Sequence, residues 1–527
     1  FIDSHFNYHT ANDTFYNLSR NSLAHQGSYL LPLLQYFANT DLSKLKAETD
    51  DVYVNLPLIK MVSYPFSWIL PMLILVTLLF LFLIIYGLHK RKLSGKVMAK
   101  GFVPFLLSLI LCGIMGFFGW KLMLVLYPQY LEIQQGFTYN GHWYIAFFVV
   151  LSLAITFAIY NKFTNKFNEP SYYVAPLLFW LLINLAVFIV LKGAAFFIIP
   201  VFFGLVSFFV MLRQERPSLL AMVFLAAPAL FIFAPLIQFF PVGLGLKMLV
   251  ISCVFTVLLF ALLWPVFGYY KLKGLLSVVC ILFATFFFIK AHFKSDFSAE
   301  RKKPNSLIYY KDADIDKTYW LTYDKEIDAW TQQYLGERPE DASKILGEAS
   351  YNKYGTDFSF AKEAPLKTIP DFEVILEADT LVENLRDVKF TIVPKRKVNK
   401  IDLYAENATF QSLTFNGKEM PASSISKNYR GTKNSALINY YVSENDSLKV
   451  HFSATKGTPV TFKVMEYSFD LMGDDQFNIS KRPDYTMPKP FVITDAVAVK
   501  RTFSVDSLRV KVIDTFQTNL QNRLMYE

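Results

Sequence analysis

Long apolar runs alternate with short polar segments in the middle of the chain, from about residue 67 to residue 292. Runs of about 18 or more apolar residues with few charges are typical of transmembrane helices. The pattern predicts eight of them, at residues 67–88, 102–126, 143–160, 172–191, 194–212, 218–239, 247–269 and 274–292. We therefore expect a multi-pass α-helical membrane protein whose block of residues 67–292 contacts the lipid bilayer.

The pattern changes after this block, where the chain becomes polar and mixed in charge. Residues 293–370 are expected to form a mixed connecting region, with a short helix at residues 325–335. From residue 371 to residue 527 apolar and polar positions mostly alternate with a period of two, which is typical of strands. The alternation predicts strands at 372–378, 388–393, 400–405, 409–415, 436–442, 448–453 and 459–469. Short strands separated by turn residues indicate a mainly-β, sandwich-like domain.

The beginning of the chain differs from both later regions. Residues 7–14 are polar and aromatic, as in a loop. Pro32 is expected to kink the helix that follows. The apolar residues of that helix recur at helical spacing, as Leu23, Gly27, Leu30, Leu34 and Phe37. We expect residues 1–40 to be the end of a soluble domain and residues 41–66 to be a linker into the membrane.

The positive charges predict an orientation in the membrane. Residues 65–292 contain 15 Lys and Arg against three acidic residues. Eleven of the 15 lie in alternate loops, at residues 89–100, 161–171, 213–217 and 270–273. The positive-inside rule places such loops in the cytoplasm. The N-terminal piece and the C-terminal domain are then extracytoplasmic, in the periplasm or exterior of a bacterium or in the vacuole or endoplasmic-reticulum lumen of a eukaryote.

The same distribution argues against two classes of function. The net charge of +9 comes from the membrane block, and the rest of the chain has 37 basic against 40 acidic residues. This excess is therefore a topology signal, and we expect no nucleic-acid partner. The predicted helices have no Asp, Glu or His at their centres, whereas ion-coupled transporters use ionisable groups inside the membrane.

Asp312, Asp314 and Asp316 have the spacing of a calcium loop, but Lys317 and Tyr323 occupy its Gly and Glu positions, which favours a solvated acidic turn.

One short motif near the N-terminus suggests a metal site. A lone His in a loop is rarely a ligand, because metal sites are recognised as clusters. Here, however, Tyr8-His9-Thr10 is followed by Asp13-Thr14 and then by a helix. This motif resembles the closing motif of metallopeptidase family 28, the co-catalytic zinc aminopeptidases. Residues 52–65 are similar to the segment that enters the membrane in the multi-pass branch of that family, which includes the vacuolar membrane protease and the endoplasmic-reticulum metallopeptidase.

The resemblance implies that residues 1–40 are the C-terminal remnant of an α/β zinc-peptidase domain. It implies that His9 binds one of two zinc ions and that Tyr8 donates a hydrogen bond to the developing oxyanion. Asp13 and Thr14 would hold the loop by local hydrogen bonds. The family's other ligands (a His-x-Asp segment, a bridging Asp, a Glu-Glu pair and a further acid) are absent from residues 1–64. The intact parent protein is thus expected to be a zinc exopeptidase that acts on peptide N-termini, and this chain alone is expected to be inactive.

A second hypothesis belongs to a different class. The chain could be a non-catalytic membrane scaffold or transport module whose extracytoplasmic β domain binds a protein partner. A peptidase-like domain that has lost its metal ligands would fit this hypothesis as well. The ligand set upstream of His9 discriminates between the two, because an intact set favours an enzyme and a degraded set favours a scaffold. The sequence identifies neither the protein partner nor the peptide sequence of the substrate.

Overall fold

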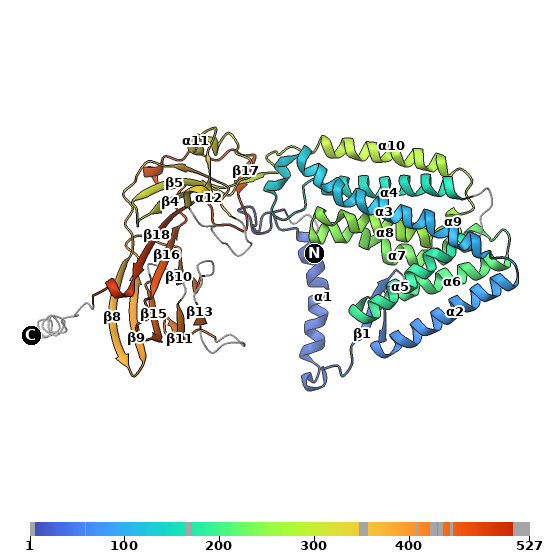
Figure 1. The fold of residues 1–527 in the computed structure, drawn as a ribbon, viewed down its shortest axis with the longest axis horizontal. Coiled ribbons are helices and arrows are strands. Elements are labelled where there is room, and N and C mark those ends of the chain that lie inside the picture. Colours follow the sequence, from blue (N-terminus) through green and yellow to red (C-terminus); the bar gives the residue numbers. More distant parts are fainter. Residues whose placement is uncertain are drawn as a thin grey trace, which may run out of the picture. The chain divides into compact units, whose positions relative to one another are not determined.

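The computed structural model describes residues 6–57, 59–164, 170–346, 357–405, 408–421, 429–430, 436–442 and 446–509. The chain forms two compact units (Figure 1). The first unit comprises Phe1–Tyr8 and Asn12–Asp296, and the second comprises His9–Ala11 and Phe297–Glu527. Each unit is described separately.

The first unit starts with a helix and a hairpin. Helix α1 (Arg20–Ala38) begins at Ser19, whose hydroxyl accepts the backbone N–H of Ser22 at 3.2 Å. It contains Pro32 and none of its residues is buried. A short 3-10 helix η1 (Leu42–Lys44) follows, and then β1 (Asp51–Leu56) pairs with β2 (Lys60–Pro65) in antiparallel register.

The membrane block consists of apolar helices with short connections. Seven helical segments of the described residues are long and apolar enough to cross a membrane. They contain the helices α2 (Ile69–His89), α3 (Gly95–Leu126), α4 (Gly141–Phe163), α5 (Val174–Val190), α6 (Ile198–Arg213), α7 (Leu219–Leu244) and α10 (Lys273–His292). The 3-10 helices between or beside them are η2 (Phe66–Trp68), η3 (Pro128–Glu132), η4 (Pro170–Tyr173), η5 (Lys192–Phe197) and η6 (Leu246–Met248).

The segment predicted as a single helix at 247–269 is broken in the structure. Its apolar part, Leu246–Leu262, comprises η6 and α8 (Leu249–Leu262) and is shorter than the other seven. A separate turn, α9 (Trp264–Phe267), follows and has Pro265 in its first positions. In this early position the missing backbone N–H of proline leaves no helical hydrogen bond unmade, so Pro265 begins a new turn after the break. Seven of the eight predicted segments are therefore long apolar helices in the structure, and the segment at 247–269 is a shorter one.

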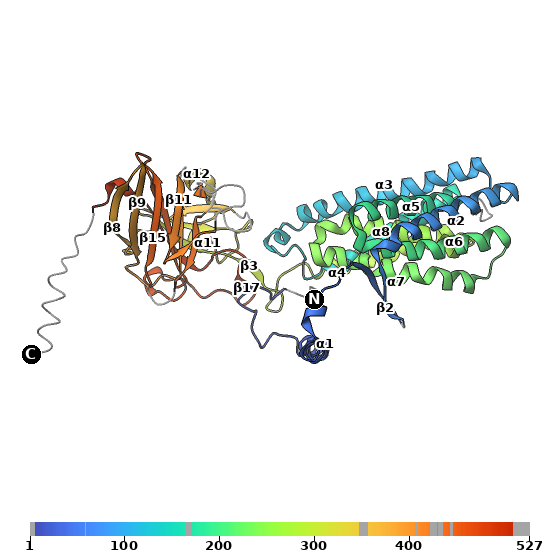
Figure 2. The ribbon, with the colours of Figure 1, turned by 90° about the horizontal axis from the view of Figure 1, so that it is seen from below.

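Close packing of small residues holds the block together. Gly116 of α3 lies against α8, and a Cβ built there would be 2.7 Å from the Cα of Val250. Gly113, one turn earlier, leaves 3.7 Å to the side chain of Val254. Helix α10 packs along α4, and Figures 1 and 2 show the long helices running side by side. Small residues at such contacts let helix backbones approach closely in membranes.

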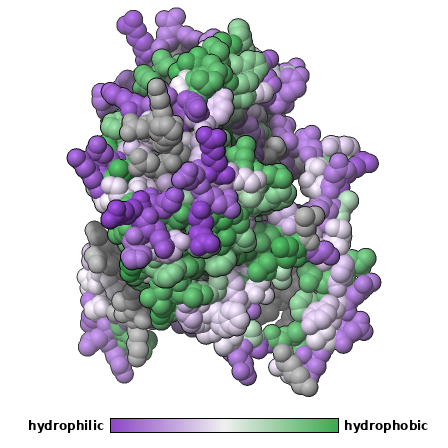
Figure 3. Space-filling view, turned by 90° about the vertical axis from the view of Figure 1, so that its right-hand side faces the viewer, coloured by the Kyte–Doolittle hydropathy of each residue, from purple (hydrophilic) through white to green (hydrophobic). Residues whose placement is uncertain are grey.

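The loops rich in Lys and Arg lie at a common end of the block. Contacts join the α2–α3 loop to the α6–α7 loop and to η4, and join the end of α4 to the start of α10. These contacts are Lys92–Glu215, Ser94–Ser171 and Asn161–Gly274. Figure 3 faces this end and shows hydrophilic side chains beside apolar helix surfaces. The structure thus brings together the basic loops that the sequence pattern placed on one side.

The second unit is β-rich. Its strands are β3 (Lys303–Asn305), β4 (Ile308–Asp312), β5 (Lys317–Thr322), β6 (Glu340–Asp341), β7 (Phe360–Glu363), β8 (Glu373–Val382), β9 (Leu385–Val393), β10 (Lys400–Ala405), β11 (Thr409–Phe415), β12 (Lys418–Glu419), β13 (Tyr429–Arg430), β14 (Ile438–Tyr441), β15 (Leu448–Thr455), β16 (Thr461–Ser468), β17 (Thr486–Pro488) and β18 (Ala496–Ser504). Its short α-helices are α11 (Gln332–Leu335) and α12 (Ala342–Leu346), and its 3-10 helices are η7 (Asp475–Phe477) and η8 (Val505–Ser507). Each predicted strand segment overlaps an observed strand, so the prediction of a β-rich region is confirmed.

Two larger sheets form the core of this unit. One has the order β14-β10-β16-β18-β4-β5-β7-β6, and the other has the order β12-β11-β15-β9-β8, with β13 beside β11. A third, two-stranded sheet pairs β17 with β3 in parallel. Buried aromatic rings from both larger sheets pack together between them, among them Phe390, Phe410, Phe452, Phe462 and Phe503. Two sheets that share a buried face form a sandwich.

Candidate functional site

The residues of the N-terminal motif lie in the turn region before α1. Tyr8 is 52 % exposed, and His9 has a positive φ of 57°. His9 belongs to the second unit, and its ring packs edge-on against Phe491 of the same unit, with 5.4 Å between ring centroids. Asp13 and Thr14 are exposed, and the backbone N–H of Thr14 donates to the carbonyl of Asn12 at 2.8 Å.

These residues do not by themselves form a two-zinc site. The part of the chain that the structure describes contains no group of three or more His, Cys, Asp or Glu side chains that could hold a metal. A zinc centre with protein ligands uses at least three of them. Within the described residues the motif therefore supplies a single imidazole.

The helix that follows the motif has an unusual surface. Leu23, Leu30, Leu34 and Phe37 of α1 recur at helical spacing, and all four are exposed. A helix with an apolar stripe normally buries that stripe against another element. Among the described residues no such burial occurs for α1, so its stripe is available to a partner element.

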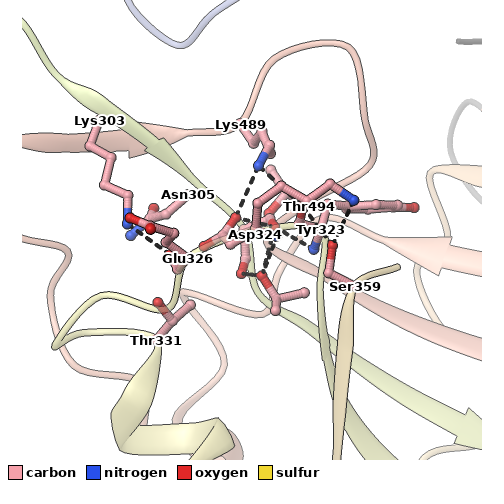
Figure 4. Close-up of polar contacts among 12 residues, drawn as sticks. Lys303, Asn305, Tyr323, Asp324, Glu326, Thr331, Ser359, Lys489 and Thr494 are labelled. Atoms are coloured by element: carbon pink, nitrogen blue, oxygen red, sulfur yellow. Dashed lines mark hydrogen bonds and ion pairs between the residues drawn. The ribbon is translucent and has the colours of Figure 1, made fainter. Parts of the chain in front are cut away.

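The second unit contains a cluster of charged side chains whose polar contacts are more extensive than those of the N-terminal motif. Figure 4 shows its centre, where Lys489 approaches Asp324. The Lys489 ammonium lies 3.4 Å from Oδ1 of Asp324 and donates to the carbonyl of Tyr323 at 3.2 Å. The Ser306 hydroxyl donates to the same carboxylate oxygen at 2.8 Å. The two charged side chains are only 2 % and 0 % exposed, so this is a buried ion pair.

A second pair lies beside the first. The Lys303 ammonium is 3.3 Å from Oδ2 of Asp328, and the Asn305 amide donates to that oxygen at 3.0 Å. The other carboxylate oxygen accepts the backbone N–H groups of Trp330 and Thr331 at 3.0 and 2.9 Å. Burial raises the pKa of Asp328, but the Lys303 charge and the Thr331 hydrogen bonds outweigh it, so the pKa lies below its ordinary value.

A third pair completes the cluster. The Arg482 guanidinium donates two parallel hydrogen bonds of 2.7 Å to the carboxylate of Asp495. Its Nε donates to the Asn305 amide oxygen at 2.7 Å, and its Cζ lies 4.6 Å from the ring centroid of Trp330. Bidentate geometry of this kind gives the stronger charge-assisted hydrogen bonds.

The geometry of these three pairs indicates a structural role. Each of the three cations faces a carboxylate, so the cluster is balanced in charge and presents a closed network instead of a free base or nucleophile. It fastens the segment that contains Arg482, Lys489 and Asp495 onto strand β3 and the turn after β5, where β17 also pairs with β3. Sequence reasoning missed the cluster, because the partners Asp324 and Lys489 lie 165 positions apart and no local spacing links them.

The interior of the sandwich contains one poorly satisfied carboxyl group. Glu466 of β16 is fully buried, and neither of its carboxylate oxygens has a hydrogen-bond partner among the described residues. Arg396 lies near it and donates through Nη1 to the Ser468 hydroxyl. Burial raises the pKa of Glu466 to about 7, although the Arg396 charge acts in the opposite direction.

The acidic trio of the sequence forms the turn between β4 and β5. The Lys500 ammonium lies 3.1 Å from Asp312 and 3.4 Å from Asp314, and Lys311 lies 3.5 Å from Asp316. The Asp312 carboxylate also accepts the backbone N–H of Asp314 at 3.1 Å. The carboxylates thus face ammonium groups and the backbone of their own turn. Those of Asp312 and Asp314 are only 13 % and 27 % exposed, so the expected solvated turn holds for Asp316 alone, at 67 %.

Comparison of the chain with protein-family models, curated proteins and solved structures finds no match. The resemblance carried by residues 8–14 and 52–65 therefore stays a prediction.

Proposed function

We propose that this chain is the membrane-embedded and C-terminal part of a membrane-anchored zinc exopeptidase. In this proposal Leu246–Leu262 together with α9 forms an eighth crossing beside the seven long helices. The basic loops face the cytoplasm, because positive charges are retained on that side. The N-terminal segment and the β-rich unit then lie on the extracytoplasmic side, where the substrates are peptide N-termini.

The observation that carries this proposal is the combination of the Tyr8-His9 motif with α1. In the resembled family the closing His lies near the end of the peptidase domain and is followed by a helix. Helix α1 follows His9 at this position and exposes a stripe of Leu and Phe that needs a partner. A peptidase domain with the remaining ligands is the partner that would bury this stripe.

The proposed roles follow the motif residue by residue. His9 would be one zinc ligand, and Tyr8 would donate a hydrogen bond to the oxyanion of the tetrahedral intermediate. Asp13 and Thr14 would fix the loop that presents them. The two-zinc site requires further ligands from outside the described residues, so the chain alone is expected to bind no zinc pair and to hydrolyse no peptide.

The test is a substitution in the full-length membrane protein. His9→Ala should lower zinc-dependent release of an N-terminal amino acid from a fluorogenic peptide by at least about 100-fold, since even residues that only orient a ligand affect activity 10–100-fold. His25→Ala is the matched control, because His25 is an exposed histidine of α1. Equal activity of the His9→Ala protein and the wild type would refute the assignment.

One feature favours the second candidate, a partner-binding scaffold. The tip of the β8–β9 hairpin exposes Leu381, Val382 and Leu385 together. Exposed apolar side chains that cluster on a rigid hairpin are typical of an interaction surface. A full-length protein that lacks zinc and peptidase activity, together with a partner interaction lost in Leu381→Ser, would support this candidate over the exopeptidase.

A further inference from the structure

An apolar groove lies between α2 and α5 of the membrane block. It has a volume of about 400 Å³ and is lined on one side by residues from Leu70 to Leu81 and on the other by residues from Leu178 to Leu185. The only hydroxyl in its lining belongs to Thr77 and donates to the Leu73 carbonyl of its own helix at 2.7 Å. The walls therefore offer hydrocarbon contacts and no hydrogen bonds to an occupant.

Water does not suit this space. A buried water needs about 10–15 Å³ and two to four polar partners, and the groove has the volume without the partners. An empty groove of this size would leave its leucine walls without contact atoms, which destabilises packed structures. The groove must therefore be filled by hydrocarbon, and in a bilayer this comes from a lipid chain or from another helix.

The dimensions of the groove select the lipid chain. From Leu70 to Leu81 the helix rises roughly 17 Å, at about 1.5 Å per residue. This is about half of the ~30 Å hydrocarbon core, which is the depth that one leaflet occupies. A partner helix that crosses the bilayer extends over the full ~30 Å of the hydrocarbon core, about twice the length of the groove.

One end of the groove is bounded by packed residues. The cluster of Val52, Tyr64, Ile69 and Ala195 joins the β1–β2 hairpin to the start of α2 and to η5. Leu73 lines both the groove and a water-sized cavity of about 10 Å³ beside this cluster. The groove is thus confined to the leaflet next to the start of α2.

We propose that the groove between α2 and α5 binds one acyl chain of a membrane phospholipid. A chain in the groove contacts two helices at once, whereas a lipid that lies over a single helix contacts one face. The chain in the groove should therefore exchange more slowly than the surrounding lipids. This site is independent of the proposed peptidase activity, since its residues belong to the membrane helices alone.

The experiment uses the full chain reconstituted in vesicles of palmitoyl-oleoyl phosphatidylcholine that contain a phosphatidylcholine with a photoreactive acyl chain. After illumination, mass spectrometry of peptides should find the label concentrated on residues 70–81 and 178–185. Native mass spectrometry in mild detergent should find one retained phospholipid per chain. Leu78→Trp combined with Leu182→Trp fills the groove and should lower both signals at least 10-fold.

The matched control is Leu75→Trp, which adds the same side chain on α2 at a 62 % exposed position outside the groove. It should retain the lipid and the label. Unchanged retention in the filled variant, or label spread evenly over the exposed helix surfaces, would overturn the proposal. A disulfide between two copies of a Leu78→Cys variant would also overturn it, because it would make a second copy the occupant. If the double variant does not fold, Leu182→Phe alone gives the same comparison with a smaller insertion.

Discussion

Removing the ammonium of Lys489 should open the β-rich unit locally. The substitution Lys489→Met keeps the length of the side chain and leaves the carboxylate of Asp324 buried without its cation. Deleting one partner of a buried ion pair usually costs about 3–5 kcal/mol. Protonating a carboxylate of ordinary pKa at pH 7 costs about 4 kcal/mol. Because Asp324 can take up a proton instead of staying charged, this cost is the upper limit on the loss of stability. We therefore expect Lys489→Met to lower the free energy of local unfolding by about 3–4 kcal/mol at pH 7.

The pH dependence of the loss tests this reasoning. Protonating an ordinary carboxylate at pH 5 costs only about 1.5 kcal/mol, so the effect of Lys489→Met should shrink to that value. The double variant Asp324→Asn with Lys489→Met should recover most of the stability, because Ser306 can still donate to the Asn oxygen. Both outcomes follow from the burial of the pair.

Hydrogen exchange of the purified full chain, followed by mass spectrometry of peptides from β4 and β5, measures the local opening free energy. Lys481→Met is the matched control, since Lys481 and Asp484 form a pair at 3.8 Å that is 91 % and 86 % exposed. Exposed pairs contribute little, so this variant should exchange like the wild type. Equal exchange in Lys489→Met and Lys481→Met, or a loss that does not shrink between pH 7 and pH 5, would refute the reasoning.

Two further predictions concern other buried positions. The pKa of Glu466 is raised from 4.5 to about 7 in the folded state. Between these two pH values the folded state keeps a proton that the unfolded chain has released. The stability of the folded state therefore falls as the pH rises from 4.5 to about 7, by roughly 3 kcal/mol in total. Glu466→Gln should remove this part of the slope in urea unfolding followed by pulse proteolysis at pH 5 and pH 8, and an unchanged slope would contradict the assignment. Gly116→Leu should lower the thermal stability of the membrane block in detergent, because even its Cβ would lie 2.7 Å from the Cα of Val250. Gly113→Ala should not, since its Cβ has 3.7 Å to the nearest side chain, and equal melting temperatures would contradict the packing argument.

Much of the fold was predictable because its signals are local. An apolar run long enough to span a bilayer identifies a helix without knowledge of its neighbours, and seven helical segments meet this criterion in the structure. Alternation identifies a strand in the same way, as for β16, where buried and partly exposed positions alternate from Thr461 to Met465. The segment at 247–269 differs because the regular helix ends at Leu262 and a new turn begins at Trp264, so an apolar run overestimates the length of the regular helix.

The candidate site was less predictable. The sequence pointed to Tyr8 and His9 only through resemblance to a family, and the described residues contain no cluster that completes a metal site. The charged network around Asp324 and Asp328 had no signal in the sequence, since Lys, Asp and Arg are ordinary surface residues when their partners are unknown.

The sequence by itself determined a multi-pass block, the common side of its basic loops and a β-rich C-terminal region. These properties depend on composition and on periodicity over about ten to twenty residues. The tertiary structure alone decided that Asp324 meets Lys489, that Glu466 is buried inside the sandwich, and that α2 and α5 leave a groove between them. Such features arise where segments distant in the chain pack together, and no local pattern specifies which side chains then share a low-dielectric or unfilled space.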